Sequence, residues 1–255
     1  MYKLTQPPTI GITTFDQNEH GHYHLASTTV EAIRLAGGLP ILLPPSEADE
    51  SAAILEVLDG LIFSGGGDLD PATYNGSAHP AISDVNQLRD AFELELARLV
   101  LKTDIPVLGI CRGIGVLSVA SGGSLVSHIP DEFGELVAHT GGTAESVKHQ
   151  VQIEPDSRLA SIIETSEVTV VSLHHQAVRS VPPGWRVVAH ACDQVIEAIE
   201  HEHHPWAIAL QWHPELALDD PQAQRIFCSL VQAAYQRKIK NKHNYSLLTS
   251  PSLCK

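Results

Sequence analysis

The chain has 255 residues, 43% of them hydrophobic, so it can bury a sizeable core and is not expected to be disordered. The formal net charge of −14 argues against a nucleic-acid partner, because phosphate binding rewards lysine and arginine clusters. No apolar run reaches the ~18 residues of a membrane helix, and the first residues contain no apolar stretch of signal-peptide length. We therefore expect a cytoplasmic protein with no membrane partner.

The first half of the chain alternates short apolar runs with amphipathic segments. The runs, expected to be buried strands, cover residues 9–13, 40–44, 61–63 and 107–110. The segments between and after them, expected to be helices, cover residues 28–36, 51–58, 85–102 and 114–120. In the longest of these helices Leu88, Phe92, Leu96 and Leu99 keep to one face. This alternation is typical of a parallel sheet covered by helices on both faces.

The second half of the chain contains closely spaced strands. They are expected at residues 149–153, 168–172, 185–190, 195–200 and 208–212, and a closing helix at 221–237. Such spacing favours an antiparallel or mixed extension of the sheet. The sequence thus predicts an α/β fold of three layers, with a mainly parallel central sheet, helices on both faces and an antiparallel extension. We expect one domain over residues 1–240 and a flexible C-terminal tail over 241–255.

Cys111 lies between Gly109 and Gly113, where the strand 107–110 meets the helix 114–120. A residue placed there must turn sharply, and the glycines let neighbouring backbone approach without a Cβ clash. The same geometry exposes the serine of a G-x-S-x-G elbow. The helix dipole would favour the thiolate, which is the nucleophilic form of cysteine. The sequence predicts that Cys111 is a catalytic nucleophile.

Two further segments are expected near Cys111, because ligands of parallel sheets bind at the carboxyl ends of the strands. The first is the triple-glycine loop at residues 65–67, whose N–H groups could stabilise an oxyanion together with the N–H of Arg112. Taken alone, this loop could equally be a flexible connection. The second contains His213 and Glu215, after the strand 208–212. A thiolate nucleophile needs such a base and a carboxylate to orient it.

Five motifs in chain order carry a resemblance to a known family. They are SGGGD at residues 64–68 with Pro71, RDAFE at 89–93, GICRG at 109–113, SLHHQ at 172–176 and WHPE at 212–215. Over roughly residues 8–236, the chain resembles class I glutamine amidotransferase-like hydrolases. It is most similar to the γ-glutamyl-γ-aminobutyrate hydrolases of peptidase family C26, so the resemblance implies the class I glutamine amidotransferase-like fold.

The resemblance also implies roles for individual residues. Cys111 would be the nucleophile, His213 the general base and acid, and Glu215 the orienting carboxylate, while Gly66 and Arg112 would supply the oxyanion N–H groups. The residues implied in substrate binding are Gly65, Gly115, His149, Ser172, His174 and His175. The implied reaction cleaves a small-molecule γ-glutamyl amide through a thioester, in polyamine or γ-aminobutyrate metabolism. It requires no cofactor.

Gly115 departs from the family pattern. Relatives usually carry glutamine there, where its side chain helps hold the γ-glutamyl group, and they often have asparagine at the position of Ser118. Glycine removes that contact and costs the helix about 1 kcal/mol relative to alanine. The change indicates a bulkier or different substrate, a weak enzyme, or a site no longer used for hydrolysis.

Three alternatives and one assembly state remain open. Histidines at 20, 22, 24 and at 201, 203, 204 suggest a metal, but neither group has a recognised ligand spacing, so no metal is expected. A partner-dependent glutaminase subunit would pass ammonia to a synthetase. A non-catalytic ligand-binding protein could use the same fold. A homodimer is possible on general grounds alone.

Overall fold

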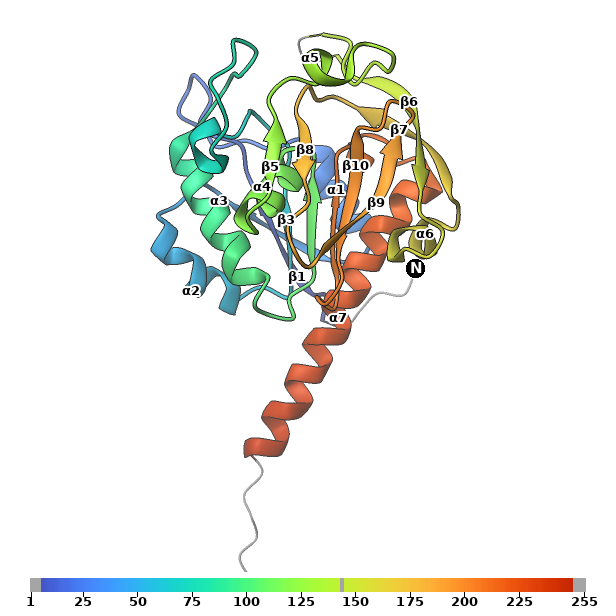
Figure 1. Cartoon of the computed structure of the whole chain (residues 1–255). Coiled ribbons are helices and arrows are strands. Elements are labelled where there is room, and N and C mark those ends of the chain that lie inside the picture. Colours follow the sequence, from blue (N-terminus) through green and yellow to red (C-terminus); the bar gives the residue numbers. More distant parts are fainter. Residues whose placement is uncertain (1–5, 143–144, 250–255) are drawn as a thin grey trace, which may run out of the picture.

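Within residues 6–142 and 145–249, which the computed structural model describes, nine strands form one central sheet (Figure 1). Their order is β2-β1-β3-β4-β11-β10-β9-β6-β7. The parallel part consists of β2 (Leu39–Leu43), β1 (Thr9–Thr13), β3 (Gly60–Phe63), β4 (Val107–Ile110) and β11 (Ala207–Leu210). The antiparallel part consists of β10 (Ile196–His201), β9 (Trp185–Ala191), β6 (Val147–Ile153) and β7 (Glu167–Ser172). The predicted mixed sheet is confirmed.

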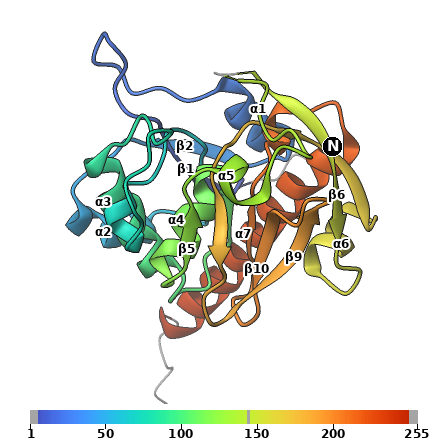
Figure 2. The same cartoon turned by 45° about the horizontal axis from the view of Figure 1, so that its top comes forward.

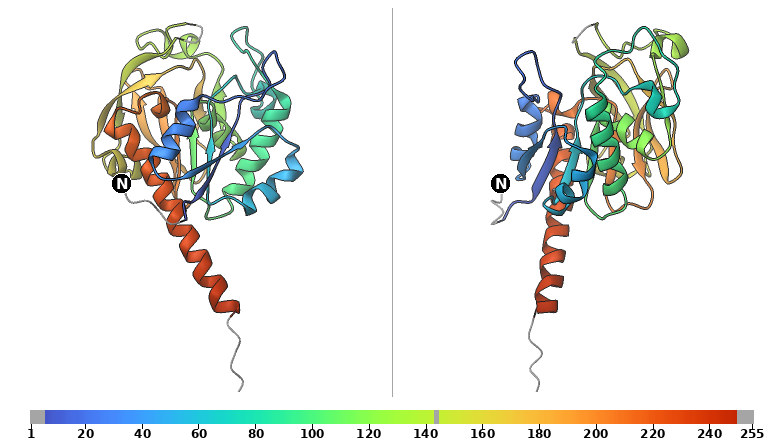
Figure 3. Two further views of the ribbon diagram at one scale, coloured as in Figure 1. Left: turned by 180° about the vertical axis from the view of Figure 1, so that it is seen from behind. Right: turned by 90° about the vertical axis from the view of Figure 1, so that its left-hand side faces the viewer.

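Helices cover both faces of this sheet (Figures 1 and 3). One face carries α1 (Ser27–Leu35) and α7 (Pro221–Thr249), and the other carries α2 (Ser51–Glu56), α3 (Gln87–Val100) and α4 (Arg112–Ala120). The strands bury side chains on both sides because each face meets apolar helix residues. Ile33 and Phe227 belong to one core, and Phe92 and Leu117 to the other. The predicted three-layer architecture is therefore confirmed.

Some elements differ from the sequence-based expectation. Strand β2 is buried at Leu43 but exposed at Leu39, Ile41 and Leu42, because it lies at the edge of the sheet that the described residues form and pairs there with β1. The inner face of α3 also differs, since Leu88 is exposed and charged residues are buried beside Phe92. Short elements absent from the expectation are α5 (Ile129–Phe133), α6 (Arg158–Ile163) and the two-stranded sheet of β5 (Ser124–Val126) and β8 (Ala177–Ser180).

Helix α7 is longer than the expected closing helix. It continues to Thr249, so residues 241–249 of the expected tail are helical, and its second half extends away from the rest of the fold (Figures 1 and 3). Residues 250–255 of that tail lie outside the described part of the chain. None of the helices described is both long and apolar enough to cross a membrane.

The site is positioned by the central strands. Strand β4 lies between β3 and β11, with Phe63 paired to Gly109 and Leu210 paired to Ile110. The segments that follow these three strands therefore emerge side by side at one end of the sheet. Figure 2 turns this end toward the viewer, with the β1–α1 connection and α5 around it.

Candidate active site

Cys111 forms the predicted sharp turn between β4 and α4. Its backbone has φ 52° and ψ −106°, in a region that residues other than glycine rarely adopt. A Cβ on Gly109 would lie 2.7 Å from the carbonyl oxygen of Gly113, and one on Gly113 would overlap the carbonyl oxygen of Phe63. Both neighbouring glycines are thus required by close backbone packing. Such strain, about 1–3 kcal/mol, is typical of functional sites.

His213 and Glu215 form a buried pair just after β11. Nδ1 of His213 donates to Oε1 of Glu215 over 2.7 Å, and the start of the turn η3 (Pro214–Leu216) holds the carboxylate in place. Burial alone would lower the pKa of His213, but the negative charges of Cys111 and Glu215 outweigh it and raise the pKa well above its ordinary value. The imidazole therefore stays protonated beside the sulfur to a higher pH than a free histidine would.

The triple-glycine loop packs against this pair. A Cβ on Gly65 would lie 3.1 Å from Cε1 of His213 and 3.6 Å from Cβ of Cys111. Gly66 has φ 136°, which a side chain would make strained. Among the described residues, neither the N–H of Gly66 nor that of Arg112 donates a hydrogen bond to the protein. Both N–H groups are thus free to donate to an oxygen bound near Cys111.

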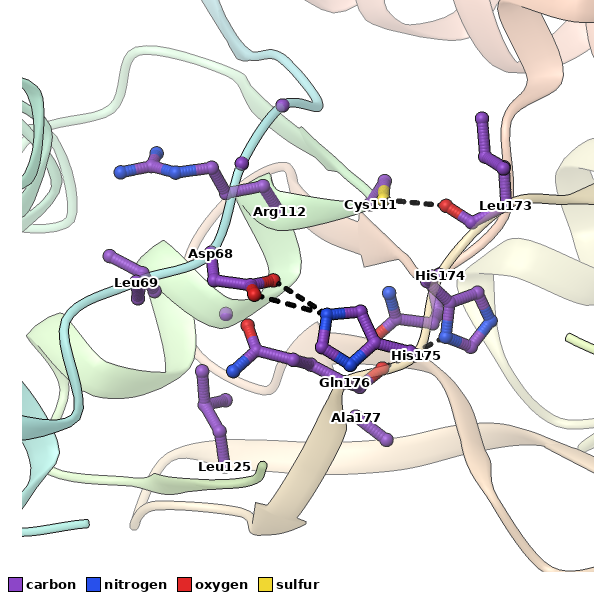
Figure 4. A pocket seen from close by; sticks show the side chains of 14 residues that line it. Asp68, Leu69, Cys111, Arg112, Leu125, Leu173, His174, His175, Gln176 and Ala177 are labelled. Carbon is purple, nitrogen blue, oxygen red and sulfur yellow. Dashed lines mark hydrogen bonds and ion pairs between the residues drawn. The ribbon is translucent and has the colours of Figure 1, made fainter. Parts of the chain in front are cut away.

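A buried ion cluster lies beneath the loop and the elbow. The side chain of Arg112 points away from the sulfur (Figure 4) and pairs with Asp90 and Glu93. Arg89 donates to Glu93 over 2.9 Å and to the carbonyl oxygen of Gly65 over 2.7 Å. Burial alone would raise the pKa of Glu93, but Arg112 and Arg89 outweigh it and lower the pKa. The RDAFE motif thus holds the triple-glycine loop and the Cys111 elbow in place, a role that its spacing alone did not reveal.

A small cavity of about 90 Å³ lies next to Cys111 (Figure 4). Its wall includes Gly115, Leu69 and Leu125, and His175, whose Nε2 donates to Asp68 over 3.0 Å. A Cβ on Gly115 would lie 3.2 Å from Leu69 and 3.3 Å from Leu125. The two leucines thus pack over the position where relatives usually carry glutamine. Leu125 belongs to β5, a strand that was not expected from the sequence.

A wider cleft of about 960 Å³ opens above the sulfur. Phe15, Asp16, Gln17 and His24 line it, so the polar β1–α1 connection borders the entrance. His213 and Arg89 also line it. The cleft therefore offers room for a substrate group larger than the small cavity could hold.

Most of the expected site residues meet at this end of the sheet. Cys111, Arg112, Gly66, Gly115, His174 and His175 line the small cavity, and His213 lines the cleft above it. Ser172 and His149 line neither space. The Ser172 hydroxyl is fully buried and donates to the carbonyl oxygen of His139 over 2.9 Å, and the His149 ring packs against His139. Both residues belong to the layer behind the cavity wall.

Behind that wall, Glu197 is a fully buried carboxylate facing several histidines. Burial alone would raise the pKa of Glu197, but His139, His174 and His149 outweigh it and lower the pKa to about 2. The carboxylate is therefore ionised at neutral pH. Glu197 and His139 were not identified from the sequence, because they lie far apart along the chain.

Most of the chain is similar in sequence to known proteins. A model of the family described as Peptidase C26 matches residues 8–215. A Mycobacterium tuberculosis relative named "Putative glutamine amidotransferase" is 40% identical over 235 residues, covering 89% of this chain and 75% of the relative. The γ-glutamyl-γ-aminobutyrate hydrolase PuuD of Escherichia coli strain K12 is 32% identical over 254 residues, covering 95% and 99%.

A solved structure resembles the whole fold. It is titled as a "putative gmp synthase subunit a protein" of Thermoplasma acidophilum, with a TM-score of 0.66 and 18% identity. The match covers 94% of this chain and 100% of that one. At this identity the likeness supports the architecture and not a shared activity.

Proposed function

The chain belongs to the peptidase C26 family, and from that premise we propose that it is a cysteine hydrolase that cleaves a γ-glutamyl amide to glutamate and an amine. The observation that carries the proposal is the strained Cys111 elbow beside the buried His213–Glu215 pair. Nucleophile, base and orienting carboxylate are the groups that covalent acyl transfer needs.

In the proposed first step, the thiolate of Cys111 attacks the γ-carbonyl carbon and a C–S bond forms. The N–H groups of Gly66 and Arg112 donate to the oxygen that becomes negative. Protonated His213 gives its proton to the amine nitrogen as the C–N bond breaks. His213 then removes a proton from water, which attacks the thioester and releases glutamate and the thiolate.

The proposed substrate is γ-glutamyl-γ-aminobutyrate or a related γ-glutamyl amine. The small cavity would hold the glutamyl group and the wider cleft the leaving amine, which fits their volumes of about 90 and 960 Å³. Gly115 leaves the glutamyl end of the site without the amide that relatives supply. We therefore expect the contacts of His175 and Asp68 to contribute more to glutamyl binding here.

A panel of γ-glutamyl amides tests this proposal. We expect glutamate release from γ-glutamyl-γ-aminobutyrate and from at least one other γ-glutamyl amine, measured by coupled glutamate oxidation. Gly115→Gln is the informative variant, because its side chain must displace Leu69 or Leu125 and narrow the cavity. No glutamate from any amide, in the wild type and in this variant, would refute the hydrolase.

Glutamine belongs in the same panel because one relative carries the name of a glutamine amidotransferase. A glutaminase subunit would release glutamate from glutamine, and faster once its synthetase partner is added. Preference for glutamine over every γ-glutamyl amine would therefore favour that second function. A non-catalytic ligand-binding protein would bind γ-glutamyl compounds and release nothing.

The alkaline limb of the pH profile should depend on Glu215. The raised pKa of His213 keeps the imidazole protonated, and able to protonate the amine, until the pH rises through that value. Glu215→Gln removes one of the charges that raise this pKa. We therefore expect the alkaline limb of kcat/KM to move to lower pH in Glu215→Gln, with a lower plateau. An unchanged limb would show that another group limits activity at high pH.

A further inference from the structure

Four side chains in and behind the cavity wall converge on one point. His139 lies between α5 and β6, His149 on β6, His174 two residues after β7, and Glu197 on β10. One ligand atom from each lies within 4.8 Å of the others. The side chains of His139, His149, His174 and Glu197 are only 3%, 7%, 3% and 0% exposed. The fold thus brings three imidazoles and a carboxylate together in its interior.

The converging atoms face one another at ion-pair distances without forming hydrogen bonds. Oε1 of Glu197 lies 3.2 Å from Nδ1 of His139, 3.5 Å from Nε2 of His149 and 3.6 Å from Nε2 of His174. None of these contacts has hydrogen-bond geometry, and these nitrogens and both carboxylate oxygens have no other partner in the described chain. A buried polar atom left without a hydrogen bond destabilises the folded state. Several such atoms in one place indicate that a group outside the protein chain pairs with them.

The opposite nitrogen of each ring is engaged. Nε2 of His139 donates to the buried carboxylate of Asp193 over 2.9 Å, and Nδ1 of His174 donates to the carbonyl oxygen of Gln176 over 2.8 Å. Nδ1 of His149 lies 3.2 Å from the carbonyl oxygen of Gln150. Metal-ligating histidines are usually oriented in this way, with the second nitrogen donating to a carboxylate or carbonyl. The rings therefore present their free lone pairs to the shared point.

We propose that His139, His149, His174 and Glu197 bind one divalent cation, with Zn²⁺ as the preferred ion. Ligand atoms at tetrahedral bond lengths of about 2.0–2.2 Å are about 3.3–3.6 Å apart. The distances of 3.2–3.6 Å from Glu197 to the three rings are close to this range. Three imidazoles and one carboxylate make a donor set that suits zinc.

The site would be structural, because four protein ligands leave no open position for substrate. Its effect would reach the cavity through the segment after β7. The carbonyl oxygen of Leu173 lies 3.6 Å from Sγ of Cys111, and His175 forms part of the cavity wall. A metal on His174 would hold this segment, and so shape the wall facing the nucleophile.

Measuring the metal content of tag-free protein tests the proposal. All measurements use the Cys111→Ala variant, so that the thiolate of Cys111 cannot bind metal. We expect about one equivalent of Zn²⁺ by plasma mass spectrometry, and after chelation one equivalent of Co²⁺ with the strong visible bands of a tetrahedral site. Glu197→Gln should lose this uptake. Asp193→Asn should weaken the affinity for Co²⁺ by about 10–100-fold, because it removes the support of His139.

A matched control is His22→Gln, in the exposed histidine run, which should keep one equivalent. If Glu197→Gln does not fold, His149→Gln serves instead, because His149 is the least buried member. The proposal is overturned if the Cys111→Ala protein takes up neither Zn²⁺ nor Co²⁺ at micromolar concentrations and its Tm does not change with either ion. Uptake that survives both Glu197→Gln and His149→Gln would also overturn it. These readouts need no substrate, so they stand apart from the hydrolase assay.

Discussion

Replacing Cys111 with alanine is expected to lower kcat for γ-glutamyl amide hydrolysis by about 10⁴-fold or more, because the proposed reaction then has no nucleophile. The fold should survive, since alanine is smaller and the hydrogen bond of the Cys111 sulfur to the carbonyl oxygen of Leu173 is long, at 3.6 Å. Intact-protein mass spectrometry gives an independent readout. A γ-glutamyl electrophile should add to the wild type once and to Cys111→Ala not at all.

Cys228 supplies the matched control for this experiment. It is an exposed free thiol on α7, outside the residues that line the cavity and the cleft. Cys228→Ala should keep both the hydrolysis rate and the single adduct. Equal activity in Cys111→Ala and the wild type would refute the covalent mechanism and leave the fold assignment untouched. An adduct that disappears in Cys228→Ala would show that the electrophile labels the surface and not the site.

The second large effect is expected for Glu93→Gln, which should lower the free energy of unfolding by about 3–5 kcal/mol. Glu93 is fully buried and pairs with both Arg89 and Arg112, so the substitution leaves buried positive charge uncompensated. Arg89 holds the carbonyl oxygen of Gly65, and Arg112 is the residue that follows Cys111. Activity should therefore fall as well. Urea unfolding measures the loss as a lower midpoint at an unchanged m-value.

The effect of Glu93 should depend on pH with a definite sign. The pKa of Glu93 in the folded protein lies below its ordinary value of 4.5. Its contribution to the free energy of unfolding is therefore fully present above pH 4.5 and is lost as the pH falls through the folded pKa. The difference in free energy of unfolding between the wild type and Glu93→Gln should therefore be constant near neutral pH and become smaller only in acid.

Glu95→Gln is the control on the same helix. Its pair with Arg98 is 3.4 Å long, and both side chains are at least one-third exposed. We expect a change within about 0.5 kcal/mol. A comparable loss in both variants would mean that α3 tolerates no change of charge, and that the buried cluster has no special role.

The sequence by itself determined the parts of the molecule that depend on neighbours along the chain. Apolar runs and intervening amphipathic segments predicted β1, β3 and β4 with their helices, because secondary structure follows local periodicity. The glycines around Cys111 predicted the turn at the end of β4, because only glycine permits that backbone approach. Five motifs in the family's order predicted the peptidase C26 family, and the match of that family's model to residues 8–215 confirms this prediction.

Tertiary structure decided whatever depends on residues far apart in the chain. The exposure of β2 follows from its place at the sheet edge. The burial of Glu93 and its partner Arg89 follows from the ion pair of Glu93 with Arg112 on another helix. Charge at these positions looks like a solvent face in the sequence. The cluster around Glu197 is the extreme case, because β6, β7 and β10 must pair across the sheet before its four members meet. Local pattern cannot encode such a meeting, because long-range packing alone sets the distance between those side chains.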